Sequence, residues 1–274
     1  MTGAAEQLDA LAARDGTVLS VWVGGTDGTP WLTRLPDAVH LAASTMKLPL
    51  AVAVHRLAGR GLLRLDDELP VSPRFSSVLS GDYEVTRDYD NDDEPWRRVG
   101  STAPIGWLVE RAIVRSSNLA TNLLIDRVGT EAVNEVYRRA GATASRLRKG
   151  IQDTAAGEAG IANTATAGDL AAVLCALLDG RLLPPDAVTQ VERVLAANEW
   201  NDAIPAGLPA GTYVAHKSGW IEECCHDVGV VRPNGEAPFV LSVFTTTTLP
   251  DEAAHAVVAE AADLVWRSRH EVRG

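Results

Sequence analysis

Strand patterns lie near both ends of this 274-residue chain, and a long helical stretch separates them. Alternating apolar residues and turn signals predict strands at 16–24, 30–35, 211–219, 227–232 and 238–246. Strands this far apart in the sequence share a sheet when the chain between them folds as a unit of its own. The pattern therefore predicts a sheet built from both ends of the chain and interrupted by a helical insertion.

Helical periodicity dominates the rest of the chain. Apolar residues at helical spacing, between glycine and proline breaks, predict helices at 3–14, 44–60, 103–115, 118–128, 130–140, 167–179, 185–198 and 251–268. We expect an α/β (α+β) fold in two domains. Residues 1–61 and 203–274 form the discontinuous α/β domain, residues 62–202 form an all-α domain, and the active site lies in the cleft between them.

Three short polar motifs follow one another in a fixed order. They are Ser44-Thr45-Met46-Lys47, Ser116-Ser117-Asn118 and Lys217-Ser218-Gly219. Ser44 opens an apolar helical run, so Ser44 and Lys47 are three residues apart and share one face of the helix. A serine hydroxyl needs a nearby base to become a nucleophile, and a lysine can be that base once burial and nearby cations lower its pKa.

The second and third motifs supply what this pair lacks. Ser116 can relay a proton to a leaving amine, and Asn118 can hydrogen-bond a substrate amide. Lys217 adds a second cation, which lowers the pKa of Lys47 and helps to hold a substrate carboxylate. Together the motifs indicate one catalytic site, with Ser44, Lys47, Ser116 and Lys217 as its catalytic residues.

With these motifs the chain resembles the penicillin-recognising serine hydrolases, and within them the class A β-lactamases, whose motifs are Ser-x-x-Lys, Ser-Asp-Asn and Lys-Thr-Gly. The run Asn122-Leu123-Leu124 after the second motif adds to the resemblance. Serine replaces the family's Asp at Ser117 and its Thr at Ser218. Ser218 keeps a hydroxyl, whereas Ser117 lacks the carboxylate that braces the motif in the family.

The resemblance implies a β-lactamase-like fold, in which helices flank an antiparallel sheet. It also implies a serine hydrolase that acts through an acyl-Ser44 intermediate on β-lactam or related amide and ester bonds. Backbone N–H groups of Ser44 and Trp220 would then stabilise the oxyanion. Ser218 and Gly219 would contact the substrate, and the Trp220 ring would form an apolar wall for its acyl substituent.

One departure from class A concerns the hydrolysis of the acyl-enzyme. The family uses a glutamate to activate the attacking water, and Ile151 falls at that place. An apolar side chain cannot abstract a proton, so we do not expect the usual deacylation route. Asp153, Glu158 and Lys47 itself are the candidate deacylation bases.

A second departure lies on the strand after the third motif. Asp227 falls near the place where many class A enzymes carry an arginine for the antibiotic's carboxylate. Two carboxylates would repel each other there. We therefore expect either a different substrate or an anion held by Lys217 and Ser218 alone.

Two other functions fit the same motifs. One is a cytoplasmic esterase or amidase of metabolism or antibiotic biosynthesis with little β-lactamase activity. It predicts faster turnover of small esters or peptides than of penicillins. The other is a penicillin-binding module trapped as a stable acyl-enzyme, which predicts stoichiometric labelling without release.

Composition narrows the partners to small molecules. The net charge is −11 and no Lys/Arg-rich run occurs, so we expect no nucleic-acid partner. No apolar stretch approaches the roughly 20 residues that span a bilayer, so we expect no membrane association. The first ten residues lack the features of a signal peptide, which predicts a cytoplasmic protein unless an export signal has been removed.

We expect neither a metal nor an organic cofactor. Asp88, Asp90 and Asp92 imitate the start of a calcium loop, but glycine and glutamate are missing from the later positions, so we expect a solvated loop near the mouth of the cleft. His226 next to Asp227 predicts a structural His–Asp hydrogen bond. Cys224 and Cys225 are adjacent, and a bridge between neighbours would be strained.

Overall fold

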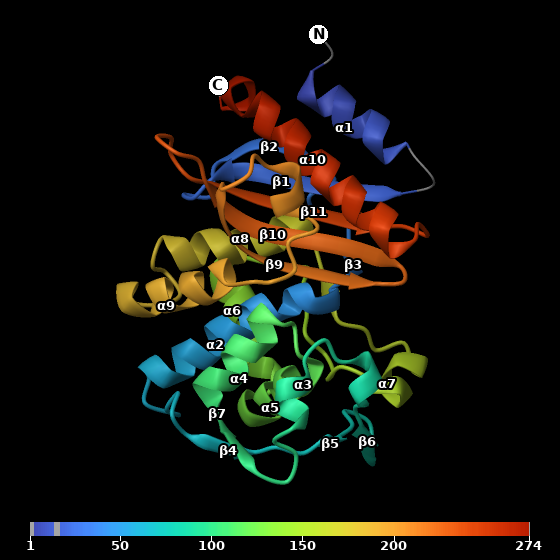
Figure 1. Ribbon diagram of the computed structural model, residues 1–274, viewed down its shortest axis with the longest axis vertical. Coiled ribbons are helices and arrows are strands. Elements are labelled where there is room, and N and C mark those ends of the chain that lie inside the picture. The colour runs from blue at the N-terminus through green and yellow to red at the C-terminus, as the bar shows by residue number, and fades with distance from the viewer. Residues whose placement is uncertain (1–2, 14–16, 274) are drawn as a thin grey trace.

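A five-stranded antiparallel sheet forms the centre of the computed structural model, which describes residues 3–13 and 17–273 (Figure 1). Its strands, in the order in which they lie side by side, are β2 (Pro30–Arg34), β1 (Val18–Gly25), β11 (Phe239–Thr246), β10 (Cys224–Arg232) and β9 (Tyr213–Ile221). β1 pairs along its whole length with β11, so the two ends of the chain share one sheet, as predicted. Residues 14 and 16, predicted as the end of the first helix and the start of the first strand, lie outside the described residues.

Helices cover both faces of the sheet. α1 (Ala4–Ala12) and α10 (Asp251–Val272) pack on one face, and α8 (Ala167–Leu178) packs on the other. Side chains alternate accordingly along β1, where Val21 and Val23 join the core beneath α10 while Trp22 joins the core on the α8 side. Because both faces are buried, β1 and β11 are apolar along most of their length.

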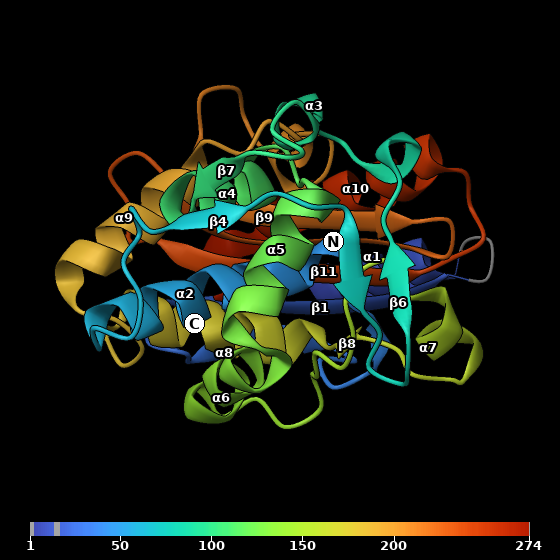
Figure 2. The ribbon, with the colours of Figure 1, turned by 90° about the horizontal axis from the view of Figure 1, so that it is seen from below.

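The other helices form a layer below the sheet in Figure 1. α2 (Lys47–Gly59) lies at its centre and contacts α4 (Ile105–Val114), α5 (Asn118–Val128) and α6 (Thr130–Ala140). Figure 2 shows α5 running across this layer. Every residue of α2 from Lys47 to His55 is buried, which explains why its sequence is apolar all round.

Several short elements join these layers. They are β3 (His40–Leu41) paired with β8 (Thr164–Ala165), β4 (Glu68–Pro70) with β7 (Thr102–Pro104), β5 (Arg74–Ser76) with β6 (Asp82–Glu84), the helices α3 (Asp93–Trp96), α7 (Thr154–Glu158) and α9 (Pro185–Ala196), and the 3-10 turns η1 (Ala43–Met46), η2 (Arg87–Tyr89) and η3 (Ile204–Gly207). Of these elements, the sequence predicted α9 alone as an element of its own. The others are too short to carry a periodic signal.

The antiparallel sheet flanked by helices confirms the predicted fold class. The division into 1–61 with 203–274 and 62–202 stays a prediction. α8 and α9 fall inside the second segment, yet α8 packs on the sheet and α9 packs along β9. Within 3–13 and 17–273, none of the helices combines the length and apolar character needed to cross a membrane.

Candidate active site

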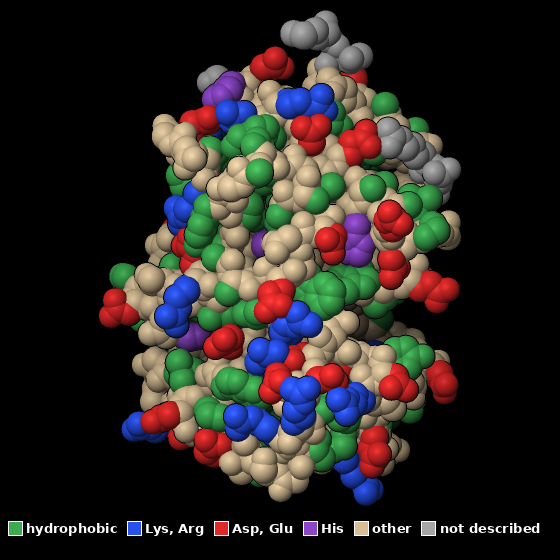
Figure 3. Space-filling view, viewed as in Figure 1, with side chains coloured by type: hydrophobic (Ala, Val, Ile, Leu, Met, Phe, Trp, Pro, Cys, Tyr) green, Lys and Arg blue, Asp and Glu red, His purple; other side chains and the backbone are tan. Residues whose placement is uncertain are grey.

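A cleft of about 810 Å³ lies where the sheet layer meets the helical layer. Figure 3 shows the molecule from the side on which this boundary is hollowed. Ser44, Asn118 and Trp220, one residue from each motif or directly after it, line the cleft together with Ile151. Four other motif residues, Lys47, Ser116, Lys217 and Ser218, are almost fully buried and are not among the residues that line the cleft.

Ser44 lies on the 3-10 turn η1, directly before α2. The sequence predicted an α-helix from residue 44, but the first turn is the tighter 3-10 helix, and Ala43 at its start has a φ of +42°. In a 3-10 helix, residues i and i+3 eclipse one another, so Ser44 and Lys47 still lie on one side. No hydrogen bond joins their side chains in the described structure.

Lys47 is held by the second motif instead. Its Nζ donates to the Ser116 carbonyl (2.7 Å), to Ser116 Oγ (3.1 Å) and to Asn118 Oδ1 (2.9 Å). Complete burial, together with the positive charge of Lys217, holds the pKa of Lys47 well below its usual range, while the negative charge of Asp90 opposes this shift. A buried lysine with a lowered pKa is suited to accept a proton.

Lys217, on β9, is also fully buried. Its Nζ donates to the Ser218 carbonyl (2.6 Å). Burial lowers the pKa of Lys217 to about 7, and the carboxylate of Asp227 opposes that shift. The neighbouring Ser218 Oγ is buried without a hydrogen-bond partner in the described structure, so it remains available to a ligand.

Backbone strain is concentrated around this site. In the described chain four residues other than glycine have a positive φ, and three of them are Ala43 (+42°), Ser116 (+57°) and Gln152 (+62°). They lie next to Ser44, within the second motif and next to Ile151, respectively. Such conformations persist only where the surrounding structure enforces them, and they cluster at functional sites.

Gly219 brings β9 against the nucleophile turn. A Cβ at this position would lie 2.6 Å from the Ser44 amide nitrogen and 2.8 Å from the Thr45 amide nitrogen. Both neighbours are backbone atoms and cannot rotate away. Glycine is therefore required here by the approach of two backbones.

Replacing Gly219 by alanine is expected to lower kcat/KM by about 100-fold, because the methyl group would displace the Ser44 turn from β9. Gly59→Ala is the control, since a Cβ at Gly59 meets no atom within 4 Å. Steady-state kinetics of both variants, with thermal melting to confirm folding, makes the measurement. Equal activities of the two variants would contradict the close approach.

The far wall of the cleft carries Ile151. Asn122 clamps its backbone from both sides, with Oδ1 accepting from the Ile151 amide (2.8 Å) and Nδ2 donating to the Ile151 carbonyl (2.9 Å).

The two carboxylates predicted as candidate bases, Asp153 and Glu158, lie outside the cleft lining. Asp153 is fully buried and caps α7, where its carboxylate accepts from Ser77 Oγ and the Ala156 amide. Glu158 is exposed on α7.

Asp90 is a residue of this site that the sequence did not reveal. The loop around it was expected to be solvated, but its carboxylate accepts hydrogen bonds from the Asn118 amide (3.0 Å), the Leu119 amide (2.8 Å) and Ser117 Oγ (3.2 Å). The expectation of a solvated loop is wrong for Asp90, because its carboxylate is bound to the start of α5, and for Asp92, which is buried and paired with Arg111. Asp88 is exposed and lines the cleft, as expected. The sequence offered no signal for the Asp90 contacts, since the partners are 27 to 29 residues away.

Comparison with known proteins places the chain in a family. The profile of the β-lactamase enzyme family matches residues 3–268. The chain belongs to this family.

Individual relatives agree with this assignment. A β-lactamase of Rhodobacter capsulatus is 30% identical over 243 residues, which cover 87% of this chain and 77% of the relative. A β-lactamase of Streptomyces fradiae is 30% identical over 230 residues, 74% of each chain. Among solved structures, a mutant class A β-lactamase of the last common ancestor of Gram-negative bacteria has a TM-score of 0.84 and 30% identity, over 97% of this chain and 98% of its own.

The fold is also that of PBP-A, whose structure has a TM-score of 0.83 at 22% identity, over 98% of this chain and 96% of its own. This identity shows a shared fold alone. The predicted resemblance to class A β-lactamases is thus confirmed for the β-lactamase family and its fold.

Asp227 does not line the cleft. It is fully buried, and its carboxylate accepts from His216 Nδ1 (2.9 Å) and the Ile204 amide (3.0 Å). Its repulsion of a substrate carboxylate stays a prediction. The predicted pairing of Asp227 with His226 was wrong, because neighbours on a strand point to opposite faces, and His216 on β9 shares the face of Asp227.

His226 packs instead behind the segment that leads to Ser44. Its Nε2 donates to the Leu41 carbonyl (2.7 Å), its Nδ1 accepts from the Thr245 amide (3.1 Å), and its ring lies 5.5 Å from that of His40. These contacts fix one neutral tautomer. Burial lowers the pKa of His226 to about 3 and that of His40 to about 4.

This histidine pair is expected to make the fold sensitive to acid. A folded-state pKa below the unfolded value of 6.5 means that the stabilisation is complete above pH 6.5 and is lost as the pH falls through about 4 and then about 3. For His40 alone the loss is about 3 kcal/mol. Urea unfolding between pH 7 and pH 4 measures it.

His40→Gln tests the assignment, because glutamine does not titrate. It should make the pH dependence of the unfolding free energy less steep, because His226 alone of the pair then contributes, whereas replacing the exposed His270 by glutamine should leave the slope unchanged. The same slope in His40→Gln as in the unaltered protein would refute the role of His40.

All three cysteines, Cys175, Cys224 and Cys225, are buried and free, in keeping with the strain expected of a bridge between neighbours.

Proposed function

We propose that this protein is a serine hydrolase that opens β-lactam rings through an acyl-enzyme on Ser44. The observation that carries the proposal is the state of Lys47, which is buried one turn from Ser44, has a lowered pKa and is bonded to the Ser-Ser-Asn motif. Membership of the β-lactamase family and the β-lactamase names of its relatives support the same reaction.

In acylation, Ser44 Oγ attacks the carbonyl carbon of the substrate and its proton passes to neutral Lys47. The backbone N–H groups of Ser44 and Trp220 stabilise the oxyanion. The C–N bond then breaks, and the leaving nitrogen receives a proton from Lys47 through Ser116, whose hydroxyl lies 3.1 Å from Nζ. The product of this half-reaction is an ester on Ser44.

The third motif and its neighbours hold the substrate. Lys217 supplies positive charge for a substrate carboxylate, and the unpartnered Ser218 hydroxyl supplies a donor. Asn118 keeps one Nδ2 hydrogen for a substrate carbonyl, since it gives the other to the Tyr89 carbonyl. Trp220, braced by Trp200 at 5.1 Å and His255 at 5.4 Å, forms a rigid apolar wall for the acyl substituent.

Deacylation is the slow step in this scheme. Ile151 cannot activate water, Asp153 is committed to capping α7, and Glu158 points to solvent. Of the three candidate bases, Lys47 is the one to which we assign this step. The same observation favours a second function, a penicillin-binding protein whose acyl-enzyme is released so slowly that it acts as a trap.

Rapid mixing with a chromogenic cephalosporin tests the proposal. We expect a burst of ring opening of about one equivalent per protein, followed by slow steady turnover. A burst without later turnover would show that the protein traps β-lactams as a stable acyl-enzyme. If β-lactams are untouched while small esters or peptides are hydrolysed, the site serves an esterase or amidase and the proposed reaction is wrong.

A further inference from the structure

We propose that Asp90 is a positioning residue of this site, which braces the Ser116-Ser117-Asn118 motif from a separate loop and so fixes the hydrogen-bond partners of Lys47. This inference rests on the proposed function. The motif has no carboxylate of its own, because its middle residue is Ser117. Asp90 supplies that carboxylate from the loop between η2 and α3.

Both oxygens of the carboxylate are occupied. Oδ1 accepts from the amides of Asn118 (3.0 Å) and Asp92 (3.2 Å), and Oδ2 accepts from the Leu119 amide (2.8 Å), Trp96 Nε1 (2.9 Å) and Ser117 Oγ (3.2 Å). The first amides of α5 have no partner within the helix, and its N-terminus carries partial positive charge. A carboxylate at this place therefore stabilises the end of the helix that begins at Asn118.

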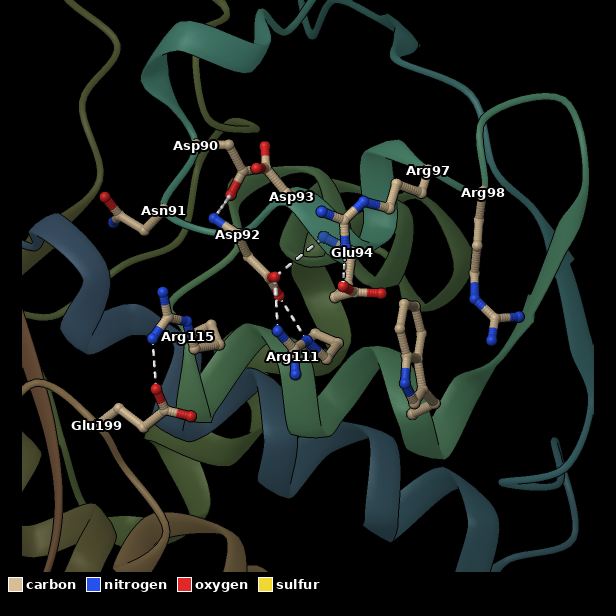
Figure 4. A pocket seen from close by; sticks show the side chains of 11 residues that line it. Asp90, Asn91, Asp92, Asp93, Glu94, Arg97, Arg98, Arg111, Arg115 and Glu199 are labelled. Carbon is tan, nitrogen blue, oxygen red and sulfur yellow. Dashed lines mark hydrogen bonds and ion pairs between the residues drawn. The ribbon is translucent and has the colours of Figure 1, made fainter.

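The side chain of Asp90 contacts the motif rather than the cleft. It does not line the cleft, but it lines a separate polar pocket of about 710 Å³ (Figure 4). Figure 4 shows the neighbouring carboxylates engaged there, with Asp92 paired to Arg111 and Glu199 paired to Arg115. Asp90 therefore acts through its hydrogen bonds to the motif.

The brace governs the geometry around Lys47. Ser116 holds a strained φ of +57°, and two of its oxygens, with Asn118 Oδ1, receive all three hydrogen bonds of Lys47. Fixing the Asn118 and Leu119 amides holds this conformation from its C-terminal side. The charged groups that act on Lys47 are Lys217 from β9 and Asp90, with opposite signs, so the brace also moderates how far the pKa of Lys47 falls.

Asp90→Asn keeps the size of the side chain but turns donors toward the Leu119 amide and Trp96. We expect Ser44 acylation to slow by about 100-fold while reversible binding changes little. The acidic limb of the acylation rate should move to lower pH, since Lys47 loses its nearby anion. Amide exchange at Asn118 and Leu119 should accelerate. Asp93→Asn is the control, because it removes a nearby exposed carboxylate, at the start of α3, that the described structure pairs with Arg87 rather than with the motif.

Exchanging the residues at positions 90 and 117 distinguishes loss of the bracing carboxylate from general disruption of the fold. Ser117→Asp alone should also slow acylation, because Ser117 Oγ lies 3.2 Å from Asp90 and two carboxylates would repel each other there. Combined with Asp90→Ser, the same change returns the carboxylate to the motif, and acylation should recover to within about 10-fold of the original rate.

Two results would overturn the inference. One is an Asp90→Asn variant that matches Asp93→Asn in acylation, pH profile and amide exchange. The other is a double variant no better than the worse single variant. If the unaltered protein is not acylated at all, the proposed function fails, and amide exchange at Asn118 and Leu119 still decides whether Asp90 braces the motif.

Discussion

Replacing Ser44 by alanine is expected to abolish covalent labelling and to lower kcat/KM about a million-fold, the scale of loss when a serine nucleophile is removed. The reason is that the hydroxyls nearest to Ser44 in the two motifs have other partners in the described structure. Thr45 is fully buried and donates its hydroxyl to the Ala42 carbonyl (2.6 Å), and Ser116 is fully buried with its hydroxyl bonded to Lys47. Steady-state kinetics and covalent labelling measure the loss.

Thr45→Ser is the matched control, because it keeps a hydroxyl that can still bond the Ala42 carbonyl. It should retain most of the activity and remain labelled. Should Ser44→Ala still form an acyl adduct with a β-lactam, another nucleophile does the chemistry and the whole assignment of the motifs fails.

Replacing Ile151 by glutamate is expected to speed deacylation by about 100-fold or more, which is the usual gain from a well-placed general base. The change needs no rebuilding of the loop, since Asn122 holds residue 151 through its backbone alone (2.8 and 2.9 Å). Ile151 already lines the cleft with Ser44. Single-turnover decay of the acyl-enzyme gives the rate.

Ile151→Gln separates proton abstraction from polarity. Glutamine has the size of glutamate but cannot take a proton from water, so its acyl-enzyme should decay at a rate near that of the unaltered protein. Equal acceleration by both residues would point to hydration of the cleft, and no acceleration by glutamate would show that water attacks from another direction.

Much of the fold could be predicted from sequence because its elements carry strong local signals. The predicted helix at 185–198 matches α9 within two residues, and the strand at 238–246 matches β11 within one. β10 was predicted from residue 227 but begins at Cys224. The run Cys-Cys-His-Asp is polar, and it is buried in a strand only because His226 and Asp227 find hydrogen-bond partners on other segments.

The order of the motifs predicted which residues meet, but it did not predict their contacts. Lys47 was expected to act on Ser44 directly, yet its hydrogen bonds go to Ser116 and Asn118. Asp90 was predicted to lie in a solvated loop and Asp153 to act as a base. In the structure both carboxylates accept hydrogen bonds from backbone amides. The partner of a carboxylate is set by the tertiary fold, and a single sequence does not show it.

Intact-protein mass spectrometry after rapid quenching tests the central claim most directly, with benzylpenicillin mixed in excess and samples taken until the substrate is exhausted. We predict an adduct of the full substrate mass, mapping to the peptide that contains Ser44, which approaches one per protein molecule and then declines as product is released. Turnover during which the protein stays unlabelled, or a label on any other residue, would contradict the account.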